Sequence, residues 1–220
     1  MSKNILMIVT NAGWLDDDHK TGLWLSEYAE PYMEFTQAGY EVTTASVAGG
    51  EIPIDPNSIS GEEPDEWDGV MEPLKNTVKL DEVDPSKYDG VFLPGGHGTM
   101  VDFPDNEAMK KVLQHFADED KVIGSVCHGP AGFVGVKDSD GKYIVDGKRM
   151  TGFTNEEEKD TQLDSKVPFL LETRLTEHGA HFLAEPNYTE HVEADGKFVT
   201  GQNPQSSLAT ARKFVQKVEQ

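Results

Sequence analysis

Residues 121–130 read KVIGSVCHGP, and this stretch decides the fold that the chain is expected to adopt. The part up to Val126 is a short apolar run, typical of a strand covered on both faces. Cys127 follows at once, with the small residues Ser125 and Gly129 two positions before and after it. Small neighbours at these positions let a chain turn sharply from a strand into a helix, as in the elbow that presents a hydrolase nucleophile. The stretch therefore predicts an α/β protein with Cys127 at a strand-to-helix turn.

Strand and helix patterns alternate on both sides of this elbow. Apolar runs predict strands at 5–9, 41–47, 91–93, 121–126 and 198–200, and helical spacing of apolar residues predicts helices at 24–37, 106–117 and 204–218. Pro31 is expected to break or kink the first of these helices. Repeated alternation of this kind favours a mostly parallel sheet with helices on both faces.

Two segments are expected to depart from the alternation. Residues 49–80 are rich in Pro, Gly, Asp and Glu and should form an irregular excursion, whereas 142–148 should form a hairpin around Asp146-Gly147. Neither segment resembles a linker, and no internal repeat is present. Residues 1–220 are therefore expected to form one domain.

The composition excludes several classes of protein. The chain has 40 Asp and Glu against 19 Lys and Arg, a net charge of −21, which disfavours binding to nucleic acid or to anionic membranes. No apolar run approaches the roughly 20 residues of a membrane span, and the single cysteine cannot form an internal disulfide. A cytoplasmic protein is expected. The acidity fits an ordinary acidic enzyme or an adaptation to high salt, and neither interpretation identifies a reaction.

Cys127 is the strongest candidate for a nucleophile. Pro130 suits the first turn of the following helix, whose free N–H groups are expected to lower the pKa of the thiol. The alternative is a buried cysteine that packs as a small hydrophobic residue. The position of Cys127 at the elbow favours the reactive interpretation.

A second predicted strand ends in Pro94-Gly95-Gly96-His97, and this end should lie beside the elbow. The carboxyl ends of parallel strands converge on one crevice, the usual location of a site in such sheets. The backbone N–H groups of Gly96 and His128 could there bind an oxyanion, and His97 could touch the substrate or have only a structural role in the loop. No phosphate-binding loop occurs, and no spacing of His, Asp and Glu indicates a metal site, so neither cofactor nor metal is expected.

Five segments together resemble the ThiJ/PfpI superfamily over essentially the whole chain. They are TGLWLSEYAEPY (21–32), FLPGGHGTM (92–100), SVCHGPAGF (125–133), TGFTNEEE (151–158) and VTGQNPQSS (199–207). The resemblance is closest to the branch of heat-shock-type chaperones and glutathione-independent glyoxalases (glyoxalase III), within a superfamily that is itself class I glutamine amidotransferase-like. It implies a flavodoxin-like sandwich and a homodimer.

The resemblance also implies a site. The nucleophile falls on Cys127, the histidine that follows it on His128, and the acidic residue set against the thiol on Glu27. The acidic partner of the histidine falls best on Glu158, with the glutamates at 156 and 157 as open alternatives. A carboxyl group beside the thiol should have a raised pKa, which suits proton shuttling.

The function that this site implies is a cofactor-free conversion of small dicarbonyls such as methylglyoxal to 2-hydroxy acids, as in a D-lactate dehydratase. Removal of early dicarbonyl adducts from proteins, a deglycase activity, would use the same residues. Two further classes stay open. One is a holding chaperone, which would need an exposed apolar surface rather than Cys127, and the other is a cysteine amidase or peptidase.

Overall fold

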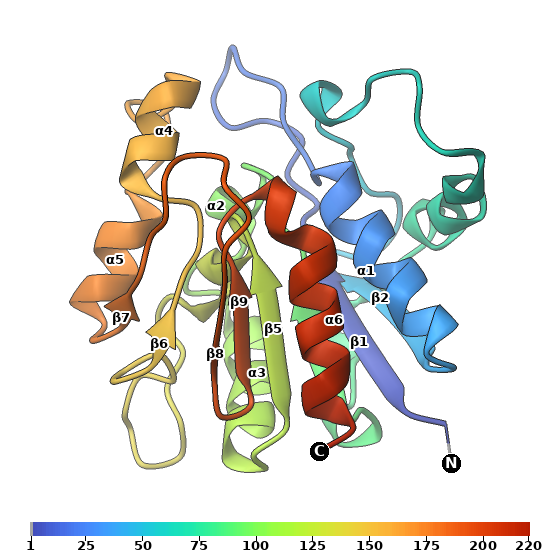
Figure 1. Ribbon diagram of the computed structural model, residues 1–220, viewed down its shortest axis with the longest axis vertical. Coiled ribbons are helices and arrows are strands. Elements are labelled where there is room, and N and C mark those ends of the chain that lie inside the picture. Colours follow the sequence, from blue (N-terminus) through green and yellow to red (C-terminus); the bar gives the residue numbers. More distant parts are fainter. Residues whose placement is uncertain (1) are drawn as a thin grey trace.

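The chain builds a seven-stranded sheet covered by helices, as described for residues 2–220 by a computed structural model (Figure 1). The strands are β1 (Asn4–Val9), β2 (Glu41–Ser46), β3 (Val78–Lys79), β4 (Gly90–Leu93), β5 (Val122–Val126), β6 (Arg149–Met150), β7 (His181–Phe182), β8 (Val192–Asp195) and β9 (Phe198–Gly201). The α-helices are α1 (Leu25–Gln37), α2 (Thr99–Asp102), α3 (Glu107–Asp118), α4 (Asn155–Thr161), α5 (Leu171–Glu177) and α6 (Ser207–Val218). The predicted strands and helices are thus present.

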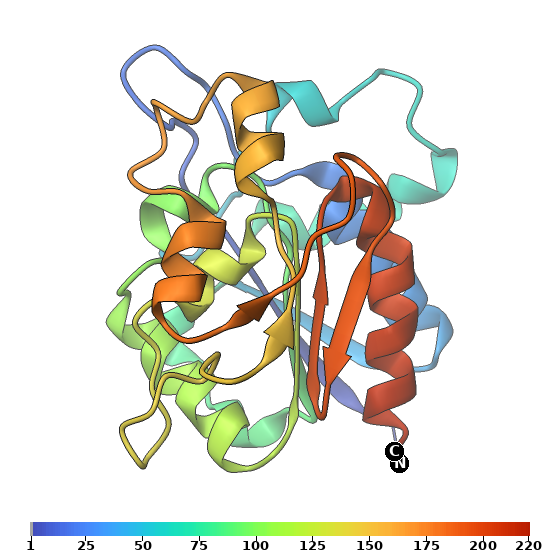
Figure 2. The same cartoon turned by 60° about the vertical axis from the view of Figure 1, so that its left-hand side comes forward.

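The sheet has the order β3-β2-β1-β4-β5-β9-β8. All neighbouring strands are parallel except β8, which forms an antiparallel hairpin with β9 beside α6 (Figure 2). A separate pair, β6 and β7, is also parallel. The predicted mostly parallel, flavodoxin-like α/β fold is confirmed. Because the strand order reverses between β1 and β4, a crevice is expected at the carboxyl ends of these strands.

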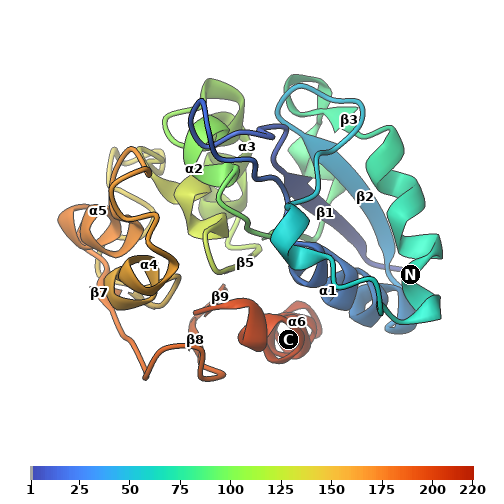
Figure 3. The ribbon, with the colours of Figure 1, turned by 90° about the horizontal axis from the view of Figure 1, so that it is seen from above.

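Helices cover both faces of the sheet, with α1 and α6 on one side and α2 and α3 on the other (Figure 3). Three buried rings join α1 and α6 to the strands: those of Phe35, Phe92 and Phe214, with centroids 4.9 to 5.6 Å apart. A Cβ atom at Gly124 in β5 would lie only 2.6 Å from the ring of Phe214. The absence of a side chain at this position lets α6 pack closely on the sheet.

The structure corrects two expectations and confirms a third. Helix α1 continues through Pro31, so the expected break is absent and a kink stays a prediction; the buried side chains of Tyr28 and Phe35 hold the turns before and after it against the core. Residues 142–148 form no hairpin around Asp146-Gly147: Tyr143 pairs with Lys137 in an isolated antiparallel bridge, and the N–H of Gly147 donates to the carbonyl of Gly179. Residues 49–80 are irregular as predicted, with short 3₁₀ helices before β3. Within residues 2–220, no helix combines the length and apolar character needed to cross a membrane.

Candidate active site

Cys127 lies at the carboxyl end of β5, where the chain makes the predicted elbow. Its φ of +59° is in the left-handed region, which a non-glycine residue adopts only when its surroundings enforce it. The Cys127 N–H donates to the carbonyl of Gly201 at 3.0 Å, and the Cys127 carbonyl accepts from the N–H of Phe153 at 2.9 Å. The elbow is therefore fixed from β9 on one side and from the segment before α4 on the other.

The small residues around Cys127 are required by the closeness of β4. The Ser125 hydroxyl donates to the carbonyl of Leu93 at 2.9 Å, and a Cβ atom at Gly129 would lie 2.1 Å from that same oxygen. The helix that follows is a short 3₁₀ segment of five residues, Gly129–Phe133. It gives the thiol little of the dipole that a long α-helix would supply.

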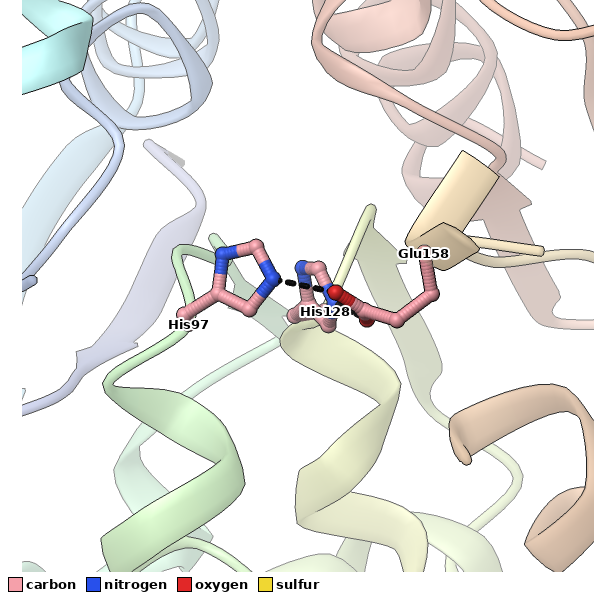
Figure 4. Close-up of side chains that lie close together, drawn as sticks. All are labelled: His97, His128 and Glu158. Carbon is pink, nitrogen blue, oxygen red and sulfur yellow. Dashed lines mark hydrogen bonds and ion pairs between the residues drawn. The ribbon is translucent and has the colours of Figure 1, made fainter. Parts of the chain in front are cut away.

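His128 connects the thiol to a buried carboxylate. Its Nδ1 lies 3.5 Å from Cys127 Sγ. Its Nε2 lies 2.5 Å from Glu158 Oε2, and Figure 4 shows these two side chains. The ring of Phe153 packs on the imidazole with centroids 4.4 Å apart and holds it in place. His128 and Glu158 are only 1% and 3% exposed. The three polar groups form a continuous path for a proton, from thiol to imidazole to carboxylate.

Helix α4 presents Glu158 because its first turn is capped. Thr154 Oγ1 accepts from the N–H of Glu157, and the Glu157 carboxylate accepts in return from the N–H of Thr154, which makes a capping box. The Glu157 carboxylate also accepts from the side chains of Gln202 and Asn203. Glu157 is thus occupied with holding α4 to the loop after β9.

Of the three adjacent glutamates, only Glu158 contacts His128. Glu156 lies on the surface and pairs with Lys159 at 3.0 Å. Among the three glutamates that the sequence left open, the contact with His128 is made by Glu158.

His97 lies beside the elbow, where its loop was expected to be, and contacts Glu158. Its Nε2 lies 2.6 Å from Glu158 Oε1, so this carboxylate binds two histidines, and the two rings are 4.0 Å apart. This nitrogen is therefore engaged with Glu158. Although no metal site was expected, one nitrogen from each histidine and a Glu158 oxygen all lie within 4.8 Å of one another.

Two backbone N–H groups, one in the loop after β4 and one at the elbow, donate to no oxygen. Among residues 2–220, the N–H of Gly96 has no backbone or side-chain acceptor, and the N–H of His128 contacts only the Cys127 sulfur. A Cβ atom at Gly95 would lie 2.8 Å from the His128 nitrogen, so the two segments approach closely. This closeness is compatible with the predicted pair of oxyanion donors.

Glu27 is fully buried at the start of α1. Its Oε1 accepts from the N–H of Gly95 at 2.9 Å, while the Gly95 carbonyl accepts from the N–H of Trp24 at 3.2 Å. The other oxygen, Oε2, is buried and accepts no hydrogen bond from another described oxygen or nitrogen. The sequence alone would favour a solvated carboxylate on this helix, and the structure shows a buried one.

The electrostatics of the thiol differ from the prediction. Burial, followed by the charges of Glu27 and Glu157, raises the pKa of Cys127 well above its usual range, so the predicted lowering is wrong for the resting site. The pKa of Glu27 is also raised well above its usual range, first by burial, although its contact with the Cys127 thiol opposes this. A protonated Glu27 removes one of the two repelling charges and offers an O–H donor near the sulfur. Proton exchange between Glu27 and Cys127 thus couples their charge states.

The second carboxylate has the opposite character. Burial alone would raise the pKa of Glu158, but the neighbouring His128 and His97 lower it below the usual range. Burial and then the charge of His128 lower the pKa of His97, which leaves it neutral near pH 7. Two buried carboxyl groups, one with a raised and one with a lowered pKa, therefore flank the Cys127–His128 pair, an arrangement typical of acid–base sites.

Two of these contacts were not predicted from the sequence, although one of them has a sequence signal. The bond from His97 to Glu158 joins segments 61 positions apart and has no local signal. The capping box that separates Glu157 from Glu158 did have one: a threonine followed three residues later by a glutamate, before a helix.

A mostly parallel α/β sheet with a strained cysteine elbow after β5, beside a histidine and two buried glutamates, defines a class of α/β proteins. The particular family follows from comparison: residues 21–217 match the DJ-1/PfpI family, and the chain belongs to it.

Three relatives show how close the similarity is. The chain is 32% identical to Glyoxalase 3 of Candida albicans over 98% of both chains. The crystal structure of glyoxalase III from Candida albicans superposes with a TM-score of 0.88 at 30% identity, over 98% of this chain and 97% of the other. The structure of the Rapid Encystment Protein 24 KDa of Francisella tularensis superposes with a TM-score of 0.94 at 39% identity, over 98% and 99%.

Proposed function

We propose that this protein is a glutathione-independent glyoxalase that converts methylglyoxal-type dicarbonyls to 2-hydroxy acids. One observation carries the proposal: Cys127 lies between the His128–Glu158 pair and the buried Glu27. Both can transfer protons, and the pKa values of the two glutamates are shifted in opposite directions. The names of the Candida relatives support the same reaction. The residues themselves account for how it would proceed.

The first step is addition of the Cys127 sulfur to the aldehyde carbon. His128 Nδ1 takes the thiol proton, and Glu158 stabilises the imidazolium through Nε2. A new C–S bond forms, and the carbonyl electron pair moves to the oxygen. That oxyanion would be bound by the N–H groups of Gly96 and His128 before it is protonated to a hemithioacetal.

The second step moves a hydrogen between the two carbons of the dicarbonyl. A base removes the proton from the former aldehyde carbon to give an enediol, and an acid returns a proton to the neighbouring carbon. Glu27 suits this shuttle because burial raises its pKa well above its usual range, so that the carboxyl group can carry a proton beside the sulfur. One carbon is oxidised and its neighbour reduced, so no external electron carrier is consumed.

The last step is hydrolysis of the resulting thioester. Water adds to the thioester carbonyl, the C–S bond breaks, and the thiolate leaves with the 2-hydroxy acid as product. The sum is one dicarbonyl plus one water, which balances. Cysteine dependence and the absence of a cofactor belong to this proposal. So do the homodimer and the cytoplasmic location expected from the sequence.

The proposal is tested with purified protein, methylglyoxal and no glutathione. Loss of methylglyoxal and formation of lactate should appear in the wild type and vanish in Cys127→Ala. Glu27→Gln should lower the rate by about a hundredfold or more, the scale of general acid–base catalysis. Asp102→Asn is the matched control, since Asp102 is a second mostly buried carboxyl group that bonds to Thr10 and Asn11. Lactate formation by Cys127→Ala at the wild-type rate would overturn the proposal.

A further inference from the structure

One group of side chains does more than the proposed reaction requires. A thiol, one imidazole and one carboxylate oxygen complete the path from Cys127 to Glu158, yet the second oxygen of Glu158 binds a second imidazole, that of His97. The three side chains come from the loop after β4, the elbow and α4, and they converge in Figure 4. Each is at least nine-tenths buried. His97 is therefore an additional ligand-type group at this position.

We propose that His97, His128 and Glu158 form a binding site for a zinc ion, and that zinc bound there inhibits the enzyme reversibly. The binding stands on the geometry of these side chains alone, whereas the inhibition rests on the proposed function. Two imidazole nitrogens and one carboxylate oxygen are a donor set that zinc uses when a fourth position is left to water. Magnesium and calcium prefer oxygen ligands and should not compete.

The donors are close to the spacing that zinc requires. With zinc–ligand bonds of about 2.0–2.1 Å, donors in a tetrahedral shell lie about 3.3 Å apart. The two nitrogen–oxygen distances are now 2.5 and 2.6 Å, and all three donor atoms lie within 4.8 Å of one another. A small rotation of the Glu158 side chain away from the two rings would open the space, with α4 left in place.

Other contacts support an ion at this position. The Thr161 hydroxyl, which donates to the backbone carbonyl of Glu158 at 2.7 Å, also lies 3.1 Å from Glu158 Oε1 and would help to hold the carboxylate. His97 is the most exposed of the three ligands, at 7%, so an ion would enter along its edge. The net charge of −21 raises the local concentration of cations around the whole chain.

Zinc at this position would stop the proposed chemistry. An ion on Nε2 of His128 requires the ring proton to be on Nδ1, the nitrogen that faces Cys127 Sγ at 3.5 Å. The imidazole then has no free nitrogen to take the thiol proton. Turnover should therefore cease while zinc is bound and return when a chelator removes it.

The experiment measures zinc binding directly, by competition of the purified protein with a chromophoric zinc chelator. The wild type should bind one zinc ion per chain. His97→Gln and Glu158→Gln should each weaken binding by at least about tenfold, since each replaces a ligand with a poor donor. Two variants should bind as the wild type does: Cys127→Ala, which keeps all three ligands, and His181→Gln, which removes an exposed histidine elsewhere.

The pattern of binding among the variants distinguishes zinc at His97, His128 and Glu158 from zinc at the Cys127 thiol. Loss of binding in Cys127→Ala with retention in His97→Gln would place zinc on the thiol and overturn the site. Equal binding by all variants, or none by the wild type, would also overturn it. If His97→Gln fails to fold, as judged by circular dichroism, Glu158→Gln decides in its place.

Inhibition is measured separately, with zinc chloride, then EDTA, and magnesium chloride as control. Zinc binding without loss of methylglyoxal turnover would overturn the inhibition alone. A protein that binds zinc at these residues but never turns over methylglyoxal would contradict the proposed function and leave the site intact.

Discussion

Nε2 of His97 lies 2.6 Å from Oε1 of Glu158, a contact that ties the loop after β4 to α4. Because the other carboxylate oxygen meets His128, the position of His97 sets the plane of the carboxylate that orients the imidazole. Contact of His97 with the substrate stays a prediction, and its Nε2 holds Glu158. Its effect on turnover would then be that of a positioning residue.

His97→Phe should destabilise the protein. The substitution keeps an aromatic ring but removes the donor to a buried, ionised carboxylate, a loss of about 1.5–3 kcal/mol. Urea denaturation monitored by tryptophan fluorescence measures the change in the free energy of unfolding. His97→Gln, which can still present an N–H donor, is the control and should lose clearly less. Equal losses in the two variants would mean that ring packing, and not the hydrogen bond, matters at this position.

The sequence predicted those features that depend on residues close together in the chain. The elbow could be located because Ser125, Cys127 and Gly129 must be small, reactive and small at fixed spacing, and β4 does pack against them. The parallel sheet followed from the alternation of strand and helix patterns. Glu27 and Glu158 were reached through a resemblance to a family, since no local pattern marks either as buried.

Features that depend on distant segments were not predictable in the same way. Whether Pro31 breaks α1 is decided by the packing of Tyr28 and Phe35, which the helix pattern does not reveal. The pKa of Cys127 was expected to fall because of a following helix, but that helix is short and burial raises the pKa instead. Solvation depends on the assembled fold, so charge states are the least accessible property of a sequence.

Gly129→Ala should disrupt the elbow. An added Cβ would lie 2.1 Å from the backbone oxygen of Leu93, which cannot move without shifting β4. Overpacking of this kind costs about 1–3 kcal/mol or more. Thermal unfolding followed by circular dichroism gives the change. The control is Gly69→Ala, where no atom lies within 4 Å of the added Cβ and φ is not positive, and it should differ from the wild type by less than about 0.5 kcal/mol. A Gly129→Ala protein as stable as the wild type would show that the elbow can relax.

Salt should raise the thermal stability of the protein near neutral pH. A net charge of −21 on 220 residues produces self-repulsion, and the screening length falls to about 10 Å at 0.1 M salt. The Tm should therefore increase with sodium chloride over the range in which screening develops. An uncharged osmolyte at matched osmolarity is the control for general solvent effects. A Tm that does not change from low to high salt would indicate that the carboxylates are already paired or well separated.

Glu27→Gln should make the protein more stable at neutral pH while it loses activity. A carboxyl group whose pKa is raised in the folded state binds a proton more tightly there than in the unfolded chain. Below the unfolded pKa of about 4.3, both states are protonated and the shift has no effect on stability. As the pH rises above that value, the unfolded state releases its proton first and is favoured, so the wild type loses stability until the folded pKa is passed. Glutamine has no such proton to release, and its side-chain oxygen can still accept from the N–H of Gly95.

The difference between the two proteins should therefore depend on pH. Free energies of unfolding are measured by urea denaturation at intervals from pH 4 to pH 8, with circular dichroism as the signal. The gain in stability of Glu27→Gln over the wild type should be small near pH 4 and should increase toward neutral pH. Asp102→Asn is an informative comparison, because burial raises the pKa of Asp102 to about 6 and its corresponding change should level off above that pH. A Glu27→Gln protein whose stability relative to the wild type is constant across this range would mean that Glu27 titrates alike in the folded and unfolded states. The proton shuttle assigned to it would then lose its physical basis.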